Sequence, residues 1–275
     1  MFKKYNNGIK LFHFDNLTKF AGIFHFITTR EGGYSLTPYD TMNLAVTVGD
    51  DPEAVRRNRT LLASLLGIST SDFALCKQVH GNNIIEANRN NIDSNSQNRF
   101  NVLSEADAMI TITPGICIMI LIADCVPILL YDPIKKAIGI THAGWRGTVK
   151  RIAEKTVEKL VDKYNCNPED IMAGIGPSIG PCCYEVGPDV IEEFERTDDD
   201  TNDIITDGKE DGKGHLNLWL ANKKQLLRAA INENNIVTAD LCTCCHSDMF
   251  FSYRCHGRKS GRFAAGIMIR KDNHA

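Results

Sequence analysis

The run ICIMILIADCVPILLY, from Ile116 to Tyr131, decides the fold of this chain. It contains two apolar segments of strand length, Ile116–Ala123 and Val126–Tyr131. Asp124 and Pro127 interrupt the run, which is therefore too short and too polar at its centre to span a bilayer. The run predicts two β-strands.

Apolar segments of strand length alternate with helical patterns along the rest of the chain. Further strands are predicted over Gly22–Thr28, Phe73–Val79, Ala106–Thr113, Ala137–Thr141, Ile171–Ile175 and Phe263–Ile269. The apolar residues from Val149 to Tyr164 follow the i, i+3, i+4, i+7 spacing of a helix. Capping residues predict other helices from Asp51-Pro52 to Gly67, from Gly187-Pro188 to Phe194, and after Asn217. This alternation predicts one α/β domain with much mixed sheet.

Two polar segments are predicted to be surface insertions in a single domain that spans residues 1–275. Residues 88–101 are rich in asparagine, and residues 197–214 are rich in aspartate. Both segments are too polar to join a core, and neither resembles an interdomain linker. Asp198 and Asp200 also suggest a calcium loop, but the run lacks the glycine and the glutamate of an EF-hand loop.

The composition is that of an ordinary globular protein. The 275 residues are 43% hydrophobic and 24% charged, with a net charge of -3. No basic stripe suited to a phosphate backbone is present, which argues against nucleic acid as a partner. No apolar stretch follows Lys3 and Lys4, so we predict no signal peptide and expect a cytoplasmic protein without a membrane partner. There the 10 cysteines are expected to be thiols, metal ligands or nucleophiles rather than disulfides.

Three residues with metal-binding side chains follow predicted strands. His80 comes directly after Phe73–Val79, Cys125 lies just past Ile116–Ala123, and His142 lies just past Ala137–Thr141. Strand ends can converge at one edge of a sheet, and two imidazoles with one thiolate suit zinc with an open fourth position. Spacing alone also allows the other interpretation, in which the histidines are ordinary buried polar residues and Cys125 is a small buried hydrophobe.

Other clusters permit two interpretations each. The cysteines and histidines between Cys242 and His256 could bind a structural zinc, but their C-x-C-C spacing is unusual, and incidental thiols explain them as well. The glycine-rich run from Gly174 to Pro181 lacks the dinucleotide fingerprint and is predicted to line a pocket. Gly144-Trp145-Arg146-Gly147 leads into the helix at Val149, so Arg146 lies either at an anion site or in solvent.

Eight motifs, in order along the chain, resemble the bacterial laccase-domain family, whose members are also called multicopper polyphenol oxidase-like proteins or multifunctional purine nucleoside phosphorylases. The resemblance runs from about residue 20 to the C-terminus. The motifs are Thr28–Gly33, Met42–Leu44, Gly49–Pro52, Gln78–Gly81, Ala123–Pro127, Thr141–Gly147, Gly176–Val186 and Phe250–Arg254.

The resemblance implies a single-domain α/β fold, a layered α-β-β-α sandwich with mixed sheets. It implies one zinc per chain, bound by His80, Cys125 and His142, with phosphate as co-substrate. It also implies phosphorolysis of adenosine, inosine, guanosine and methylthioadenosine, together with deamination of adenosine. The expected partners are therefore small molecules, and the oligomeric state is not set by the sequence.

This chemistry suggests roles for further residues in the motifs. Besides Cys125 and His142, Asp124 is a candidate catalytic residue that could orient a ligand or move a proton. Stacking on the purine is assigned to Phe251 or Tyr253. The candidate residues for holding phosphate are arginines, and those for reading polar edges of the substrate are amides: Arg30, Arg59, Arg146 and Arg254, with Asn43 and Gln78.

Three alternative functions remain. A metal-free cysteine hydrolase would use Cys125 as nucleophile and His142 as base, and the fold of the family resembles the deamidating domain of cytotoxic necrotizing factor toxins. A copper oxidase is disfavoured, because multicopper clusters need about ten histidines in H-x-H pairs and this chain has 8 histidines and no such pair. Nothing in the sequence favours a partner-binding protein without enzymatic activity.

Overall fold

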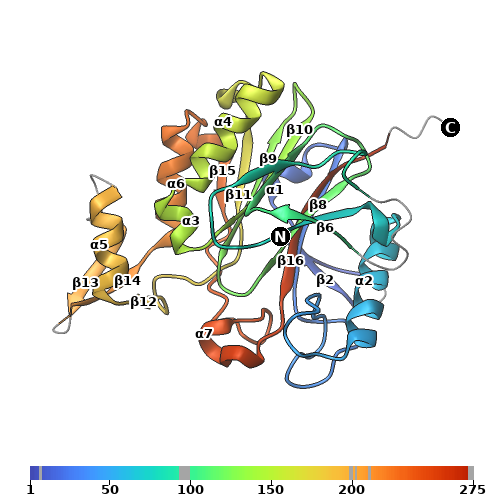
Figure 1. Cartoon of the computed structure of the whole chain (residues 1–275), viewed down its shortest axis with the longest axis horizontal. Helices are drawn as coiled ribbons and strands as arrows, with labels where there is room; N and C mark the ends of the chain where they lie inside the picture. The colour runs from blue at the N-terminus through green and yellow to red at the C-terminus, as the bar shows by residue number, and fades with distance from the viewer. Residues whose placement is uncertain (6–7, 93–99, 198–200, 202, 210–211, 272–275) are drawn as a thin grey trace.

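Two mixed β-sheets packed face to face form the centre of the protein (Figure 1). The computed structural model describes residues 1–5, 8–92, 100–197, 201, 203–209 and 212–271. The first sheet contains, in spatial order, β1 (Phe2–Lys4), β2 (Lys10–Phe12), β3 (Ile23–Thr28), β16 (Phe263–Ile269), β8 (Cys117–Ile122), β4 (Phe73–Lys77) and β6 (Asn101–Glu105). The second contains β15 (Ile236–Thr238), β11 (Met172–Ile175), β9 (Val126–Asp132), β10 (Ala137–Ala143), β7 (Ala108–Thr111) and β5 (Ile84–Glu86).

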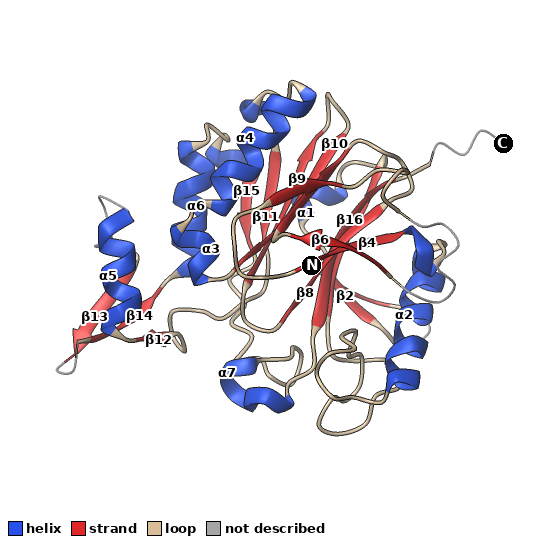
Figure 2. Ribbon diagram, in the orientation of Figure 1, coloured by secondary structure: helices blue, strands red, loops and turns tan. Residues whose placement is uncertain are grey.

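Helices cover the outer faces of both sheets (Figure 2). The helices are α1 (Asp15–Thr18), α2 (Pro52–Leu66), α3 (Trp145–Val149), α4 (Ile152–Tyr164), α5 (Pro188–Thr197), α6 (Leu218–Arg228) and α7 (Tyr253–His256). Short 3-10 turns span Thr70–Asp72, Pro168–Asp170, Glu233–Asn235 and Gly257–Lys259. Helices α4 and α6 pack on the second sheet, and α2 lies on the side of the first sheet. None of the helices in the described parts of the chain is long and apolar enough to cross a membrane.

The two strands of the run Ile116–Tyr131 are apolar because they are buried on both faces. In β8, Ile118 and Ile120 pack between the sheets, whereas Met119 packs in the cluster that contains Leu62 of α2. In β9, Leu129 faces the other sheet, and its neighbours on either side face α4 and α6. The layers follow the order α-β-β-α. The first sheet is mixed, because β4 pairs in parallel with β6 and β8, whereas β16 pairs antiparallel with β3 and β8. The predicted α/β layered sandwich with mixed sheets is confirmed.

The helix predicted from Val149 to Tyr164 is confirmed as α4 over Ile152–Tyr164, but its predicted start is wrong, because Val149 ends the separate helix α3. Arg151 adopts a left-handed conformation with φ 58° between α3 and α4. The carbonyl of Thr148 accepts a hydrogen bond of 2.7 Å from Gln225 of α6, and the Thr148 hydroxyl is bound by Asn222. These tertiary contacts hold α3 against α6 and turn the chain before α4 begins.

The segment 197–214 is not a simple surface loop. Thr197 ends α5, and β13 (Ile205–Lys209) pairs with β14 (Lys213–Leu216) and through it with β12 (Glu185–Val186). Figure 1 shows this small sheet and α5 standing out from the two central sheets. In the other polar segment, Asn101 begins β6. Residues 93–99, 198–200, 202 and 210–211 lie outside the described part of the chain.

A pair of buried histidines joins the N-terminal strands. His13 Nδ1 lies 2.7 Å from the carbonyl of His25, and His25 Nε2 accepts a hydrogen bond of 2.8 Å from the amide of Phe14. Burial lowers the pKa of His13 from 6.5 to about 4, and burial together with the nearby His13 lowers that of His25 to about 3. Both imidazoles are therefore neutral in the folded protein at neutral pH.

We expect the free energy of unfolding to decrease as the pH falls from 6.5 towards 4, because the unfolded chain binds protons in this window that the folded His13 and His25 do not. Urea unfolding at pH 7 and pH 5 measures the loss. The His25→Gln variant keeps an acceptor for Phe14 and should show a smaller difference between the two pH values. Equal pH dependence in both proteins would contradict this assignment.

Candidate metal centre

His80, Cys125 and His142 converge where the two central sheets meet. His80 follows β4, Cys125 lies in the turn from β8 to β9, and His142 belongs to β10. The pairing of β10 with β9 sets His142 opposite Pro127, close to Cys125. One ligand atom from each of the three residues lies within 4.8 Å of the other two. The three were expected at one edge of one sheet, but β4 and β8 belong to the first sheet and β10 to the second.

The backbone is strained on both sides of this centre. His80 and Asp124 have φ values of 58° and 87°, which non-glycine residues adopt rarely. Asp124 is held there by its carboxylate, which accepts hydrogen bonds of 2.6 Å from the Thr243 hydroxyl and from the Arg254 amide. Its carbonyl accepts another from Ile179. The structure therefore shows Asp124 binding two other loops beside Cys125.

Asp107 orients both histidines, and sequence analysis missed it. Its carboxylate is fully buried, lies 2.8 Å from His142 Nδ1, and accepts bonds from the amides of His80 (2.9 Å) and Gly81 (2.6 Å). Because a carboxylate only accepts, Nδ1 of His142 carries a proton, which leaves Nε2 as the ring nitrogen that can bind a metal once it loses its own proton. The available signal was one acid between Ala106 and Ala108 at the start of an apolar run.

Cys125 and His142 perturb each other strongly. Burial alone would raise the pKa of Cys125, but His142 and His80 outweigh it and lower that pKa to about 6. Burial alone would lower the pKa of His142, but Cys125 and Asp107 raise it to about 9. Cys125 is therefore a thiolate at neutral pH, the form in which cysteine binds metals and acts as a nucleophile.

The donor set can hold a metal ion. Two imidazoles and a thiolate lie close together, and Asp107 provides the outer carboxylate common behind metal-binding histidines. Gly144 leaves the space open, since a Cβ there would lie 3.0 Å from Cys125 Sγ and 3.1 Å from His80 Cδ2. Any larger residue at 144 would press on both ligands.

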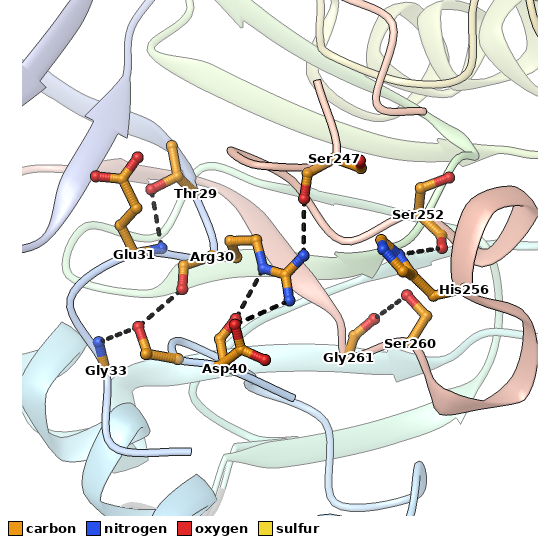
Figure 3. Close-up of polar contacts among 11 residues, drawn as sticks. Thr29, Arg30, Glu31, Gly33, Asp40, Ser247, Ser252, His256, Ser260 and Gly261 are labelled. Atoms are coloured by element: carbon orange, nitrogen blue, oxygen red, sulfur yellow. Dashed lines mark hydrogen bonds and ion pairs between the residues drawn. The ribbon is translucent and has the colours of Figure 1, made fainter. Parts of the chain in front are cut away.

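Arg30 and Phe251 form one packed unit near these loops. Figure 3 shows the Arg30 guanidinium bound to Asp40 and to the carbonyl of Ser247. Its Cζ lies 4.8 Å from the centre of the Phe251 ring, which is 1% exposed. Both predicted substrate residues thus join the segment after β3 to the loop after β15.

Three other predicted substrate residues bind main-chain groups. Arg59 donates twice to the carbonyl of Leu44, and burial lowers its pKa to about 10. The Gln78 amide exchanges two hydrogen bonds of 2.9 Å with Leu121 of β8. Asn43 is fully buried and accepts from the amide of Arg262.

Arg146 and Arg254 lie on the exposed side of the centre. Arg146 stacks on Trp145 at 4.2 Å, and Arg254 donates to the carbonyls of Cys183 and Glu185. Both interact electrostatically with Tyr184, whose pKa is raised by burial and by the nearby Cys125.

Arg262, which the sequence did not single out, contributes another positive charge. Burial lowers its pKa, against the opposing attraction of Cys125 and Asp124. The guanidinium groups of Arg146 and Arg254 therefore lie near Tyr184, and that of Arg262 lies near Cys125 in the candidate metal centre.

Residues 24–270 match the family model described as multi-copper polyphenol oxidoreductase laccase. The chain belongs to this family. Among relatives of this laccase family, a purine nucleoside phosphorylase of Bacteroides thetaiotaomicron is 39% identical over 262 residues, covering 95% of this chain and 97% of the relative. Adenosine deaminase RL5, from an unknown prokaryotic organism, is 36% identical over 261 residues, covering 94% and 98%.

Solved structures in this comparison agree with the fold. The crystal structure of YlmD from Geobacillus stearothermophilus has a TM-score of 0.90 and 32% identity, covering 98% of this chain and 99% of that chain. The Bacillus licheniformis protein YfiH has a TM-score of 0.89 and 31% identity, with the same coverage. The predicted family resemblance is confirmed.

Proposed function

We propose that this protein is a zinc-dependent purine nucleoside enzyme. It phosphorolyses adenosine, inosine, guanosine and methylthioadenosine, and it deaminates adenosine. The convergence of His80, Cys125 and His142 carries the proposal, because two imidazoles and one thiolate are a donor set typical of catalytic zinc. The phosphorylase and deaminase names of its relatives support it. We further propose a cytoplasmic location, where a reducing environment keeps Cys125 available as a thiolate.

In both reactions, the residues around the centre position the proposed ligands and the neighbouring loops. When bound, zinc supplies Lewis acidity and activates water near neutral pH. Asp107 fixes the tautomer and the direction of His142, and through the amides of His80 and Gly81 it also fixes the loop after β4. Asp124 holds the loops that carry Thr243 and Arg254 against the centre.

Phosphate is assigned to the exposed arginines. Arg146 and Arg254 are exposed cations close to Tyr184, and the more buried Arg262 adds positive charge near Cys125. Phosphorolysis places this anion against C1′ of the ribose, where positive charge develops as the glycosidic bond breaks. Tyr253, which is 48% exposed, is the aromatic side chain available to stack on the purine, whereas Phe251 packs beneath Arg30. The other predicted substrate residues affect substrate binding indirectly, through their bonds to main-chain groups: Arg30, Arg59, Asn43 and Gln78.

Adenosine incubated with zinc-loaded enzyme, with and without phosphate, tests the proposal. We expect adenine and ribose 1-phosphate only when phosphate is present. Inosine should form under both conditions, and with phosphate part of it should be cleaved further to hypoxanthine. Chromatography of the products separates the two reactions. Adenosine left intact under both conditions would exclude both activities.

A metal-free cysteine hydrolase is the second candidate. The observation that favours it is that Cys125 interacts with His142, which in turn is bound to Asp107. These three residues match a nucleophile, a base and a carboxylate that orients the base. Metal analysis decides between the two. Zinc that disappears when Cys125, His80 or His142 is replaced supports the first candidate, and full activity of chelated, zinc-free protein on an amide or ester supports the second.

A further inference from the structure

A second group of thiols lies outside the centre described above. Cys182, Cys183, Cys242 and Cys245 bring their Sγ atoms within 4.8 Å of one another. They come from two loops, residues 176–184 after β11 and residues 239–252 after β15. Main-chain bonds already join the two loops, since the amide of Thr243 donates to Ser178 and the amide of Ser178 donates to Leu241.

The distances among these sulfurs fit a shared metal ion. Cys245 Sγ lies 3.5 Å from Cys182 Sγ and 3.4 Å from Cys183 Sγ. A disulfide needs about 2.05 Å. A tetrahedral zinc site with zinc–sulfur bonds of about 2.3 Å places its sulfurs about 3.8 Å apart. The two distances from Cys245 lie close to this value, and all four sulfurs lie within 4.8 Å of one another, which leaves room for one central ion.

One of the four sulfurs accepts a hydrogen bond from the main chain. The amide of Gly180 donates to Cys242 Sγ over 3.2 Å. A divalent metal would compensate the charge of the assembled thiolates.

The sequence pointed to a cluster between Cys242 and His256, and the structure arranges it differently. Cys244 and Cys255 form a disulfide, against the expectation of free thiols. His256 is bound by Ser252 instead. The partners of Cys242 and Cys245 come from the adjacent pair Cys182-Cys183, some sixty residues earlier in the chain.

We propose that Cys182, Cys183, Cys242 and Cys245 bind a structural zinc ion. Four protein ligands close the coordination shell, which distinguishes this site from the three-ligand catalytic centre. The ion would fix both loops behind the turn at Asp124, which already binds Ile179 of one loop and Thr243 of the other. Arg254, which donates to the carbonyl of Cys183, would be positioned through the same ion.

Metal analysis of three proteins, purified without added metal under reducing conditions, tests this site. We expect about two zinc ions per chain in the wild type and about one in Cys245→Ser. Cys166→Ser, which changes a buried thiol outside the cluster, should keep about two. Equal zinc in the wild type and Cys245→Ser, or iron in place of zinc, would overturn the proposal.

The Cys125→Ser variant separates this proposal from that of the catalytic centre. It keeps the four clustered thiols, so we expect about one zinc per chain and an X-ray absorption spectrum with four sulfur ligands at about 2.3 Å. This measurement also applies if Cys245→Ser fails to fold. A zinc-free Cys125→Ser protein, or disulfides among the four cysteines in its mass spectrum after alkylation, would rule out the structural site.

Discussion

The Cys125→Ser variant is expected to lose the catalytic zinc and about three orders of magnitude in kcat/KM for adenosine phosphorolysis, the equivalent of about 4 kcal/mol of transition-state stabilisation. A serine hydroxyl is not ionised at neutral pH, whereas the Cys125 thiolate, with a pKa near 6, is ready to bind a metal. Its removal also takes away the charge that chiefly raises the pKa of His142. Zinc content and the rate of adenine release measure the two losses.

Cys166→Ser is the matched control. Cys166 is a buried thiol beside Asp132, in the core between the second sheet and α4, so its replacement should leave catalytic zinc and rate unchanged. A Cys125→Ser protein that kept its catalytic zinc and full activity would contradict the ligand assignment. If the wild type holds no zinc at this site and the Cys125→Ser replacement still abolishes activity, the cysteine hydrolase would be favoured.

The strands were predictable because burial leaves a strong local signal. Strands β8, β9, β10 and β16 are apolar on both faces, since one face meets the other sheet and the other face meets helices. The ends of helix α2 were also predictable from local sequence, because capping residues mark them. Asp51 accepts from the amide of Glu53, and Gly67 adopts the left-handed conformation that ends α2.

Features that depend on distant partners escaped the sequence. The break at Arg151 arises from Gln225, which lies far away on α6. The short strands β12, β13 and β14 depend on one another for their hydrogen bonds, and their polar sequence carries no periodic pattern. Asp107 looked like one acid in a strand, and only the fold shows that it meets His142.

The convergence of His80, Cys125 and His142 could be predicted because the residue types are chemically distinctive and each follows a recognisable strand. Residues with broader chemistry were harder to place. Arg59 and Gln78 were chosen as substrate contacts, but the structure shows their polar groups bound to the backbone of Leu44 and Leu121. Arg262, a long cation near Cys125, carried no sequence signal that separated it from other arginines.

The Asp107→Asn variant is expected to bind catalytic zinc about 10- to 100-fold more weakly and to lose a similar factor in kcat/KM. The carboxylate accepts from His142 and from the amides of His80 and Gly81, and an amide cannot accept at both atoms. If the new NH2 group donates to His142 Nδ1, the ring proton moves to Nε2 and blocks the metal-binding lone pair. Competition with a chelator measures the affinity, and NMR of the zinc-free protein should show a lower pKa for His142.

Asp132→Asn distinguishes this orienting role from a general cost of changing a buried carboxylate. Asp132 is also fully buried, and it accepts from the amides of Ile134 and Lys135 at the end of β9. An asparagine keeps Oδ1 as the acceptor for both amides, so this replacement should lower the free energy of unfolding by less than about 1 kcal/mol and leave zinc affinity unchanged. Asp107→Asn should lower both quantities, because the same carboxylate bonds that stabilise the loop after β4 also hold two of the proposed zinc ligands in place. Equal zinc affinity in Asp107→Asn and Asp132→Asn would show that Asp107 supports the fold alone.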